Sequence, residues 1–522
     1  MSVNCIRSLL EISSQTHSDK IALIHNERSL SFGELFKKVN QIAHYLSELD
    51  LKKGSRVGIY SNKSIEQVIA ILALLSTEYI FVPITRFLKP EQVEYIVKDC
   101  DIQCIITDKT KVERIKEANF EGKVITYESI DKESISFEEI YKYYSENFKT
   151  TVKSFDNAVI TYSFAASGLP KGIVITHRNL IDGARVVSKY LDLKESDIIS
   201  GTLSFNLDYG LNQIFCMLYK RATLAIHKLV LPSDFFLHLM RDKVSVLPIM
   251  PIDITQMFDD DPHRLPTPKQ LERVRIITSS GGKLTSKMLE DVEKYFPKAT
   301  FFSMHGLSEA FRSAYLDPKQ IKIRPTSIGK AIPDVELFII NEQGEACKAR
   351  EVGELIHRGA CIYKGYWNSP EDTNIRFKSI KILEKVIDLE GGLTDEIVVA
   401  SGDYVYKDEE DYIYFHSRKD DMIKTSGYRV SPAEIERVIH EHISQIDACA
   451  VFGVENEMIE EEIALVYSTS SEIAKNELIF ELKKHLPNYM IPTIIVYKKS
   501  IPLHFGKINK TTLKEEIMAK GK

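Results

Sequence analysis

The chain has 522 residues, which is too long for one ordinary hydrophobic core, so at least two domains are expected. Hydrophobic residues make up 44% and charged residues 27%, the balance of a large soluble globular protein. The net charge is −6 and the Lys and Arg residues are scattered, which excludes the basic patch that binds nucleic acid or an anionic membrane. Small molecules or proteins are therefore the expected partners.

The chain shows no sign of export, membrane insertion or zinc binding. Its seven cysteines include no CxxC pair, and its first residues lack the charged and apolar regions of a secretory signal, so a reduced, cytoplasmic location is expected. The longest apolar run, VIAILALLSTEYIFVPI (68–84), is interrupted by Glu78. It is shorter than the ~20 residues that span a bilayer, and it predicts a buried helix leading into a strand.

Short runs rich in Val and Ile alternate with longer amphipathic stretches along the first part of the chain. This alternation predicts an α/β fold, in which strands of mostly parallel sheets are joined by helices. The expected elements are the helix at 31–49, the strands at 56–60, 104–108, 158–163 and 273–282, and the helix at 285–296. The acidic stretch at 259–270 is interpreted as a solvated turn rather than a metal site.

The sequence changes in character after residue 400, where short, charged, strand-like segments appear. A helix is expected to begin at Ser431-Pro432, with Glu434 in its first turn. We place the domain boundary at Asp420, which predicts a large domain of residues 1–419 and a small α+β domain of residues 420–522.

A series of motifs then narrows the expected function. In chain order they are SGLPKGIVITHRN (167–179), LSFNLDYGLNQ (203–213), SSGGKL (279–284), SMHGLSEA (303–310), GELIHRGACIYKGYWNSPEDT (353–373), SGDY (401–404), SRKDDMIKTSGYRVSPAEIE (417–436), LPNYMIP (486–492) and GKINK (506–510). Together they resemble the AMP-forming adenylating superfamily of acyl-CoA synthetases, peptide-synthetase adenylation domains and luciferases, and the stand-alone acyl-CoA ligases most of all. The resemblance covers nearly the whole chain, in order.

The resemblance assigns roles to residues that would hold the nucleotide. Glu309 matches the acid that holds Mg²⁺ against the phosphates of ATP, and Ser308 replaces the usual Thr as a donor to the α-phosphate. Asp403 matches the acid that binds both ribose hydroxyls. Arg418 and Lys424 match further nucleotide contacts.

The small domain would carry the moving parts. Lys507 matches a mobile lysine that bridges the carboxylate and the α-phosphate during adenylation. Asp420 matches the hinge about which the small domain rotates, so that Lys507 leaves and the face around Gly427 is presented to the thiol. Two half-reactions would then share one site.

Two departures from the family pattern concern the adenine and phosphate contacts. His305 stands where relatives have a Tyr that stacks on adenine, close to Gly281 and Gly282, which let backbone approach the base. In the phosphate loop, the residues that match the pattern are Ser163, Ser167, Gly168, Lys171 and Gly172, and the changed positions are Phe164, Ala165 and Ala166. The loss of two hydroxyl donors predicts a slower pyrophosphate-releasing step rather than none.

Asp208 bears on which acid is activated, and two interpretations of it remain open. In amino-acid-activating relatives an Asp of this segment pairs with the substrate ammonium, and a buried carboxylate needs such a partner. Alternatively, Asp208 caps a helix that opens at Tyr209-Gly210.

The resemblance implies an enzyme that uses ATP and Mg²⁺ to convert a carboxylic acid into an acyl-adenylate, with release of pyrophosphate. The acyl group then passes to the thiol of CoA or of phosphopantetheine on a carrier protein. Because no carrier domain follows Lys522, any carrier protein would be a separate molecule. The alternatives are an amino-acid-activating ligase that serves such a carrier, and an ATP- or adenylate-binding protein with weak turnover owing to the altered loop.

Overall fold

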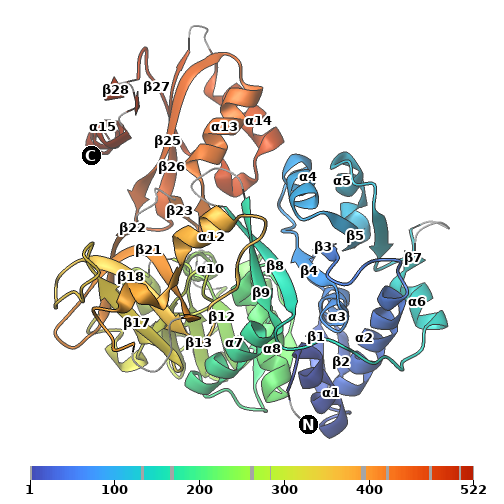
Figure 1. The fold of residues 1–522 in the computed structure, drawn as a ribbon. Helices are drawn as coiled ribbons and strands as arrows, with labels where there is room; N and C mark the ends of the chain where they lie inside the picture. Colours follow the sequence, from blue (N-terminus) through green and yellow to red (C-terminus); the bar gives the residue numbers. More distant parts are fainter. Residues whose placement is uncertain are drawn as a thin grey trace.

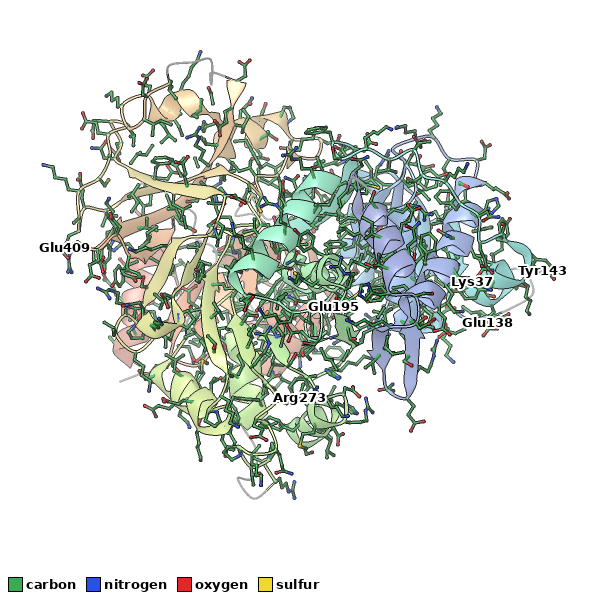
Figure 2. The ribbon with its side chains drawn as sticks, turned by 90° about the horizontal axis from the view of Figure 1, so that it is seen from below. Lys37, Glu138, Tyr143, Glu195, Arg273 and Glu409 are labelled. Carbon is green, nitrogen blue, oxygen red and sulfur yellow. The ribbon has the colours of Figure 1, made fainter. Side chains whose placement is uncertain are left out.

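The computed structural model of the chain describes residues 3–130, 135–164, 170–258, 264–282, 284–389, 395–418, 423–469, 473–501, 503–504, 507–508 and 510–520. Figure 1 shows a large body of sheets and helices with the C-terminal elements above it. Figure 2 shows charged side chains from distant parts of the chain at the surface, among them Lys37, Glu138, Glu195 and Glu409.

The first half of the large body is a sheet of mostly parallel strands. Its eight described strands lie in the order β19 (Gly365–Tyr366), β9 (Pro170–Thr176), β8 (Asn157–Phe164), β4 (Ile80–Pro83), β3 (Arg56–Tyr60), β5 (Ile102–Thr107), β6 (Lys123–Thr126) and β7 (Ile135–Ser136). The pairs from β8 through β4, β3, β5 and β6 to β7 are parallel, as expected for strands joined by crossover helices. The outer pairs, β8 with β9 and β9 with β19, are antiparallel.

The second sheet has a parallel half and an antiparallel half. Its path among the described residues runs through β17 (Val335–Ile340), β18 (Gly353–Gly359), β21 (Ile397–Lys407), β22 (Ile413–Arg418), β16 (Ser327–Ala331), β15 (Ala314–Leu316), β14 (Thr300–His305), β13 (Ile276–Ser279), β12 (Val246–Ile249), β10 (Ile198–Ser200), β11 (Thr223–Ala225), β1 (Ile21–His25) and β2 (Arg28–Ser31), and β20 (Phe377–Ser379) pairs with β21. Parallel pairing from β14 to β1 gives way to antiparallel pairing from β14 to β17. The sequence did not indicate this change, which falls beside β14.

Helices cover both sheets, and the buried residues between them form several hydrophobic clusters. They are α1 (Ile6–Thr16), α2 (Phe32–Ser47), α3 (Ile65–Leu74), α4 (Pro90–Asp99), α5 (Val112–Glu117), α6 (Phe137–Tyr143), α7 (His177–Tyr190), α8 (Asp208–Lys220), α9 (Pro232–Arg241), α10 (Pro251–Phe258), α11 (Ser286–Tyr295) and α12 (Pro370–Arg376). The start of α2 is fixed by a reciprocal capping box between Ser31 and Glu34. The apolar run at 68–84 forms the buried parts of α3 and β4, as predicted, and no helix in the described part of the chain is long and apolar enough to span a bilayer.

The C-terminal elements form a smaller unit around their own core. Its five-stranded sheet contains β24 (Tyr428–Val430), β23 (Ile423–Thr425), β26 (Glu460–Thr469), β25 (Ile446–Asn456) and β27 (Ile494–Tyr497), flanked by α13 (Pro432–His442), α14 (Lys475–His485) and α15 (Lys510–Lys520). Helix α13 begins after Ser431, whose hydroxyl accepts a hydrogen bond from the Glu434 N–H, as the sequence predicted. A separate two-stranded hairpin pairs β28 (Leu503–His504) with β29 (Lys507–Ile508).

The expected fold class is confirmed: a mixed α/β protein with parallel-stranded sheets flanked by helices and a smaller C-terminal part. All seven cysteines are buried and unpaired in disulfides. Asp420, the expected hinge, lies outside the described residues.

Candidate active site

The turn that follows β14 carries three of the predicted site residues on nearby backbone. His305 ends β14, and Ser308 and Glu309 follow within the turn. The Glu309 side chain is buried, and the Tyr366 hydroxyl donates a short hydrogen bond to its Oε1 atom. The chain switches here from parallel pairing of β13 with β14 to antiparallel pairing of β14 with β15, so the turn lies at the junction of the two halves of the sheet.

The adenine-side residues also meet at this turn. The His305 Nε2 atom lies 3.6 Å from the Asp403 Oδ2 atom, and Asp403 on β21 is almost fully buried. Burial lowers the pKa of the His305 imidazole, and the carboxylate of Asp403 acts in the opposite direction. A neutral imidazole at neutral pH remains available to stack on a base or to donate a hydrogen bond.

Strand pairing aligns the two predicted ribose contacts. Asp403 on β21 and Arg418 on β22 are directly opposite each other in the antiparallel register.

The glycine pair after β13 faces open space. Gly281 has a φ of +88°, and a Cβ atom placed there would have no neighbour within 4 Å. A Cβ atom on Gly282 would lie 3.1 Å from Pro251. A side chain at position 281 would therefore meet no neighbour, whereas one at position 282 would make a tight contact.

The described residues on either side of the predicted phosphate loop belong to the antiparallel strands β8 and β9. Ser163 on β8 pairs with Lys171 on β9, and Ala165, Ala166, Ser167 and Gly168 lie outside the described residues. The Lys171 Nζ atom lies 2.5 Å from Asp372 Oδ1 and 5.8 Å from the centre of the Tyr366 ring. Although burial acts to raise it, the pKa of the Asp372 carboxyl is lowered by hydrogen bonds from Lys171 and Ser369. Lys171 is thus held in position, with an acidic partner that a polyphosphate would replace.

The small C-terminal unit reaches this site through the turn between β23 and β24. Gly427, in this turn, has a φ of +77°, and a Cβ atom there would lie 2.3 Å from Met250 Cε and 3.7 Å from the carbonyl oxygen of Gly281. Arg429 on β24 donates a 3.4 Å hydrogen bond from Nη1 to Ser308 Oγ. Lys424 on β23 places its Nζ atom 4.2 Å from the centre of the Phe415 ring.

Lys507 is the one predicted catalytic residue whose segment is elsewhere. It begins β29, and Figure 1 draws the β28 strand that pairs with β29 beside α15, at the far end of the C-terminal unit from β23. The described residues therefore bring the Glu309 turn and Gly427 together while the hairpin of Lys507 is remote.

Asp208 is the first residue of α8, and Leu207 occupies the preceding cap position. The Asp208 Oδ1 atom accepts a 2.6 Å hydrogen bond from the Tyr209 N–H. Burial raises the pKa of the Asp208 carboxyl, against the opposing effect of the positive charges of Arg312 and Arg429. The interpretation of Asp208 as a helix cap is therefore wrong, because Leu207 holds the cap position and the half-buried Asp208 is the first helical residue.

Sequence reasoning gave no role to Tyr366, Asp372, Arg312 or Arg429. Tyr366 and Asp372 lie within the quoted motif GELIHRGACIYKGYWNSPEDT, and Arg429 lies two residues after Gly427. Only the fold brings Tyr366 to Glu309, Asp372 to Lys171, and Arg429 to Ser308.

A cavity opens between the large body and the C-terminal unit, next to the turn that contains Gly427. It has a volume of about 350 Å³. Its lining residues are Asn62, Arg86, Phe87, Lys89, Lys111, Arg114, Tyr428, Asn488 and Tyr489. This lining contains four cations and no acid, and Tyr428 stacks on Tyr489 with ring centres 4.1 Å apart.

Comparison with known proteins identifies the family. The sequence profile of the family described as AMP-binding enzyme matches residues 10–367, so the chain belongs to that family. It is 26% identical to tyrocidine synthase 1 of Brevibacillus parabrevis over 519 residues, and 26% identical to gramicidin S synthase 1 of Brevibacillus brevis over 516 residues. These matches cover 98% of this chain but 45% and 44% of the two relatives, so the chain spans less than half the length of either.

Solved structures share the fold over nearly the whole chain. The o-succinylbenzoate CoA synthetase of Bacillus subtilis superposes with a TM-score of 0.83 at 22% identity, covering 97% of this chain and 98% of that one. The amide bond synthetase McbA of Marinactinospora thermotolerans gives 0.85 at 18% identity, covering 98% and 99%. An artificially fused adenylation–PCP di-domain from Klebsiella oxytoca gives 0.79 at 20% identity, covering 94% and 93%.

Proposed function

We propose that the protein is an AMP-forming acid–thiol ligase. In the first half-reaction, a carboxylate oxygen of the acid bonds to the α-phosphorus of ATP, the bond to the bridging oxygen breaks, and pyrophosphate leaves. In the second, the sulfur of a thiol bonds to the acyl carbon, the carbon–oxygen bond to the phosphate breaks, AMP leaves, and the thiol proton passes to solvent or a base.

The observation that carries this proposal is the meeting of Glu309, His305 and Asp403 at one turn, beside the open space at Gly281. A ribose-binding carboxylate, a stacking ring and a phosphate-side carboxylate are the groups that an adenylate needs, and they come from β14, the turn after it and β21. Their arrangement favours an acyl-adenylate in this crevice over an unrelated nucleotide.

The residues present also fit Mg²⁺. Tyr366 occupies the Oε1 atom of Glu309, which leaves Oε2 for a cation, and one carboxylate together with substrate phosphates is a common protein environment for Mg²⁺. The ion, when bound, would neutralise phosphate charge. In our proposal Lys171 exchanges Asp372 for a phosphate, and Arg429 and Ser308 orient the α-phosphate.

The cavity beside Gly427 supports a thiol acceptor that carries phosphate. Four cations line it, and the positive φ at Gly427 lets backbone approach Gly281 closely, so we assign the path of the thiol arm to this turn. CoA and protein-bound phosphopantetheine both combine a phosphate with a thiol arm. We propose that Arg86, Lys89, Lys111 and Arg114 bind that phosphate.

The experiment that tests the proposal is ATP–pyrophosphate exchange with a panel of carboxylic acids, followed by mass spectrometry of products formed with CoA, a phosphopantetheinylated carrier protein, or an amine. Exchange that requires one acid, together with a thioester product, is the expected result. Tight ATP binding without exchange for any acid would favour the weak-turnover alternative. An amide product would mean that the acyl acceptor is an amine and not a thiol.

The amino-acid-activating alternative depends on Asp208. If its carboxylate pairs with a substrate ammonium, Asp208→Asn lowers kcat/KM for the amino acid by roughly 100-fold and leaves the matching acid without an amino group almost unchanged. If Asp208 only supports the start of α8, the ratio of the two specificity constants stays constant and thermal stability changes slightly.

A further inference from the structure

Arg312 is a buried cation whose hydrogen-bonding capacity the protein does not use. It lies between the Glu309 turn and β15, and only 4% of the residue is exposed. Its Nε atom is buried without a hydrogen-bond partner, and across the described residues its guanidinium forms no hydrogen bond and no ion pair. A guanidinium carries five N–H donors, and burying the one on Nε without an acceptor is costly.

Aromatic rings hold the guanidinium in place without satisfying those donors. The Arg312 Cζ atom lies 4.4 Å from the centre of the Tyr209 ring and 4.7 Å from that of Phe311. Such contacts stabilise the charge at the ring faces but accept no in-plane N–H bond. Tyr209 is itself fixed, because its hydroxyl donates a 2.9 Å hydrogen bond to the Thr278 carbonyl oxygen.

Asp208 does not neutralise Arg312 directly. It accepts its 2.6 Å hydrogen bond from the Tyr209 N–H and forms no ion pair with Arg312 in the described residues. Burial raises the pKa of the Asp208 carboxyl, and the positive charge of Arg312 opposes this rise. The two groups therefore interact electrostatically without a direct hydrogen bond. The donors of Arg312 stay available for a ligand.

These donors border a small cavity beside the proposed adenylate site. The cavity has a volume of about 10 Å³, and its polar lining includes Arg312, Tyr209, Asn212, Gln213 and Thr278. Thr278 lies three residues before Gly281, and Arg312 lies three residues after Glu309. A space of this size holds about one water molecule.

We propose that Arg312 recognises a second anionic group on the acid that is activated, and that the preferred substrate is a compact dicarboxylic acid. This inference rests on the proposed function. One carboxylate reacts with ATP at the Glu309 turn, and the other receives a forked pair of hydrogen bonds from Arg312. A carboxylate, sulfonate or phosphate shares this chemistry, and the carboxylate is the smallest of the three.

The test compares dicarboxylic acids of increasing length with their monoamides, with monocarboxylic acids of equal length, and with acids that end in a sulfonate or phosphate. The expected result is ATP–pyrophosphate exchange at least roughly 100-fold more efficient for a short dicarboxylic acid than for its monoamide. A preference for the sulfonate or the phosphate would support an anion-binding role of Arg312 but would contradict the dicarboxylic acid as the preferred substrate. Equal efficiency for acid and monoamide would overturn the proposal.

Arg312→Met removes the charge and keeps a long side chain. If Arg312 serves a ligand, this variant melts at the same or a higher temperature without ligand and loses the preference for dicarboxylic acids, because the buried charge has no partner in the free protein. Arg312→Lys should retain part of the preference. Arg273→Gln, at an exposed arginine labelled in Figure 2, is the control and should change neither property. A lower melting temperature for Arg312→Met with an unchanged preference would show a purely structural role.

A binding measurement separates this inference from the proposed function. Dicarboxylic acids are titrated into the protein with a non-hydrolysable ATP analogue, and the thermal shift is recorded. A shift in the native protein that is absent in Arg312→Met supports the inference even where no acid gives exchange, an outcome that would refute the ligase proposal alone. Exchange with monocarboxylic acids, together with no Arg312-dependent shift, would refute the inference alone.

Discussion

Two hairpins of the C-terminal unit differ in where they lie. The turn between β23 and β24 packs on the large body, where Gly427 approaches Met250 and Gly281. The β28–β29 hairpin, which contains Lys507, pairs within itself beside α15. Helix α15 in turn contacts β25, and Lys510 donates a 2.8 Å hydrogen bond to Glu436 on α13.

The difference suggests that one rigid unit serves two half-reactions in turn. If the Gly427 turn lines the path of the thiol and Lys507 acts in adenylation, both cannot occupy the crevice at once. We infer that the structure represents the thiol-transfer arrangement and that a rotation of the unit exchanges the two hairpins.

Lys507→Ala should separate the two half-reactions most strongly. We expect ATP–pyrophosphate exchange to fall roughly 100- to 1,000-fold, because a positive charge aimed at the α-phosphate is lost. Transfer from a supplied acyl-adenylate to the thiol should stay within about threefold of the native rate. Lys499→Ala, at an exposed lysine of the same unit, is the control. Equal losses in both assays would contradict alternating use of the hairpins.

Gly427→Val should slow thiol transfer more than adenylation, which is the reverse of the effect expected for Lys507→Ala. A valine here is strained by the φ of +77° and would push aside the flexible end of the Met250 side chain, so docking of the turn is disfavoured. We expect thiol transfer to fall roughly 10- to 100-fold, with exchange largely retained, as measured in separate single-turnover assays.

Gly54→Val is the matched control for this strain. Gly54 has a φ of +80° with nothing within 4 Å of an added Cβ atom, so it carries the same backbone cost without the contact. If both valine variants affected thiol transfer alike, general destabilisation rather than docking would explain the result.

Removing positive charge from the cavity beside Gly427 should weaken binding of the thiol acceptor without affecting adenylation. We expect Lys111→Ala with Arg114→Ala to raise KM for CoA roughly tenfold and to leave exchange unchanged, because these residues line the cavity beside Tyr428 and not the adenylate crevice. Lys109→Ala, on the neighbouring exposed turn, serves as the control. A change in exchange of similar size would place these cations at the ATP phosphates instead.

The docked arrangement should weaken as the pH rises. Glu434 on α13 accepts a 2.8 Å hydrogen bond from Gln92 on α4, and burial raises the pKa of its carboxyl from 4.5 to about 7. A raised pKa in the docked state means that docking is fully favoured below the ordinary pKa and loses stability as the pH rises through about 7.

This effect can be measured by energy transfer between dyes on the two parts of the protein at about pH 5.5 and about pH 8.5. The docked fraction should fall a few-fold in the native protein and by clearly less in Glu434→Gln, whose side chain does not titrate in this range, although His485 and Glu91 also pair across this interface. Glu441→Gln, at a carboxylate on the same helix that pairs with Arg437, should leave the pH dependence intact. A native docked fraction that does not change with pH would refute the link between Glu434 and docking.

The sequence by itself determined the elements whose signals are local. The capping boxes at Ser31 and Ser136, the hydroxyl cap at Ser431, and the apolar run that forms α3 and β4 depend on residues within one turn or one strand. The motifs around Lys171, Glu309 and Asp403 are equally contiguous, so their order along the chain was enough to identify the family.

Only the tertiary structure decided which of these segments meet. The contacts of His305 with Asp403 and of Tyr366 with Glu309 join strands and turns that are distant in sequence, and no local pattern encodes their register. The same holds for Arg312, whose sequence neighbours do not reveal that it is buried between Tyr209 and Phe311 without an acceptor. The position of the Lys507 hairpin away from the crevice likewise depends on how the C-terminal unit docks, because docking is governed by packing between distant surfaces rather than by the motif itself.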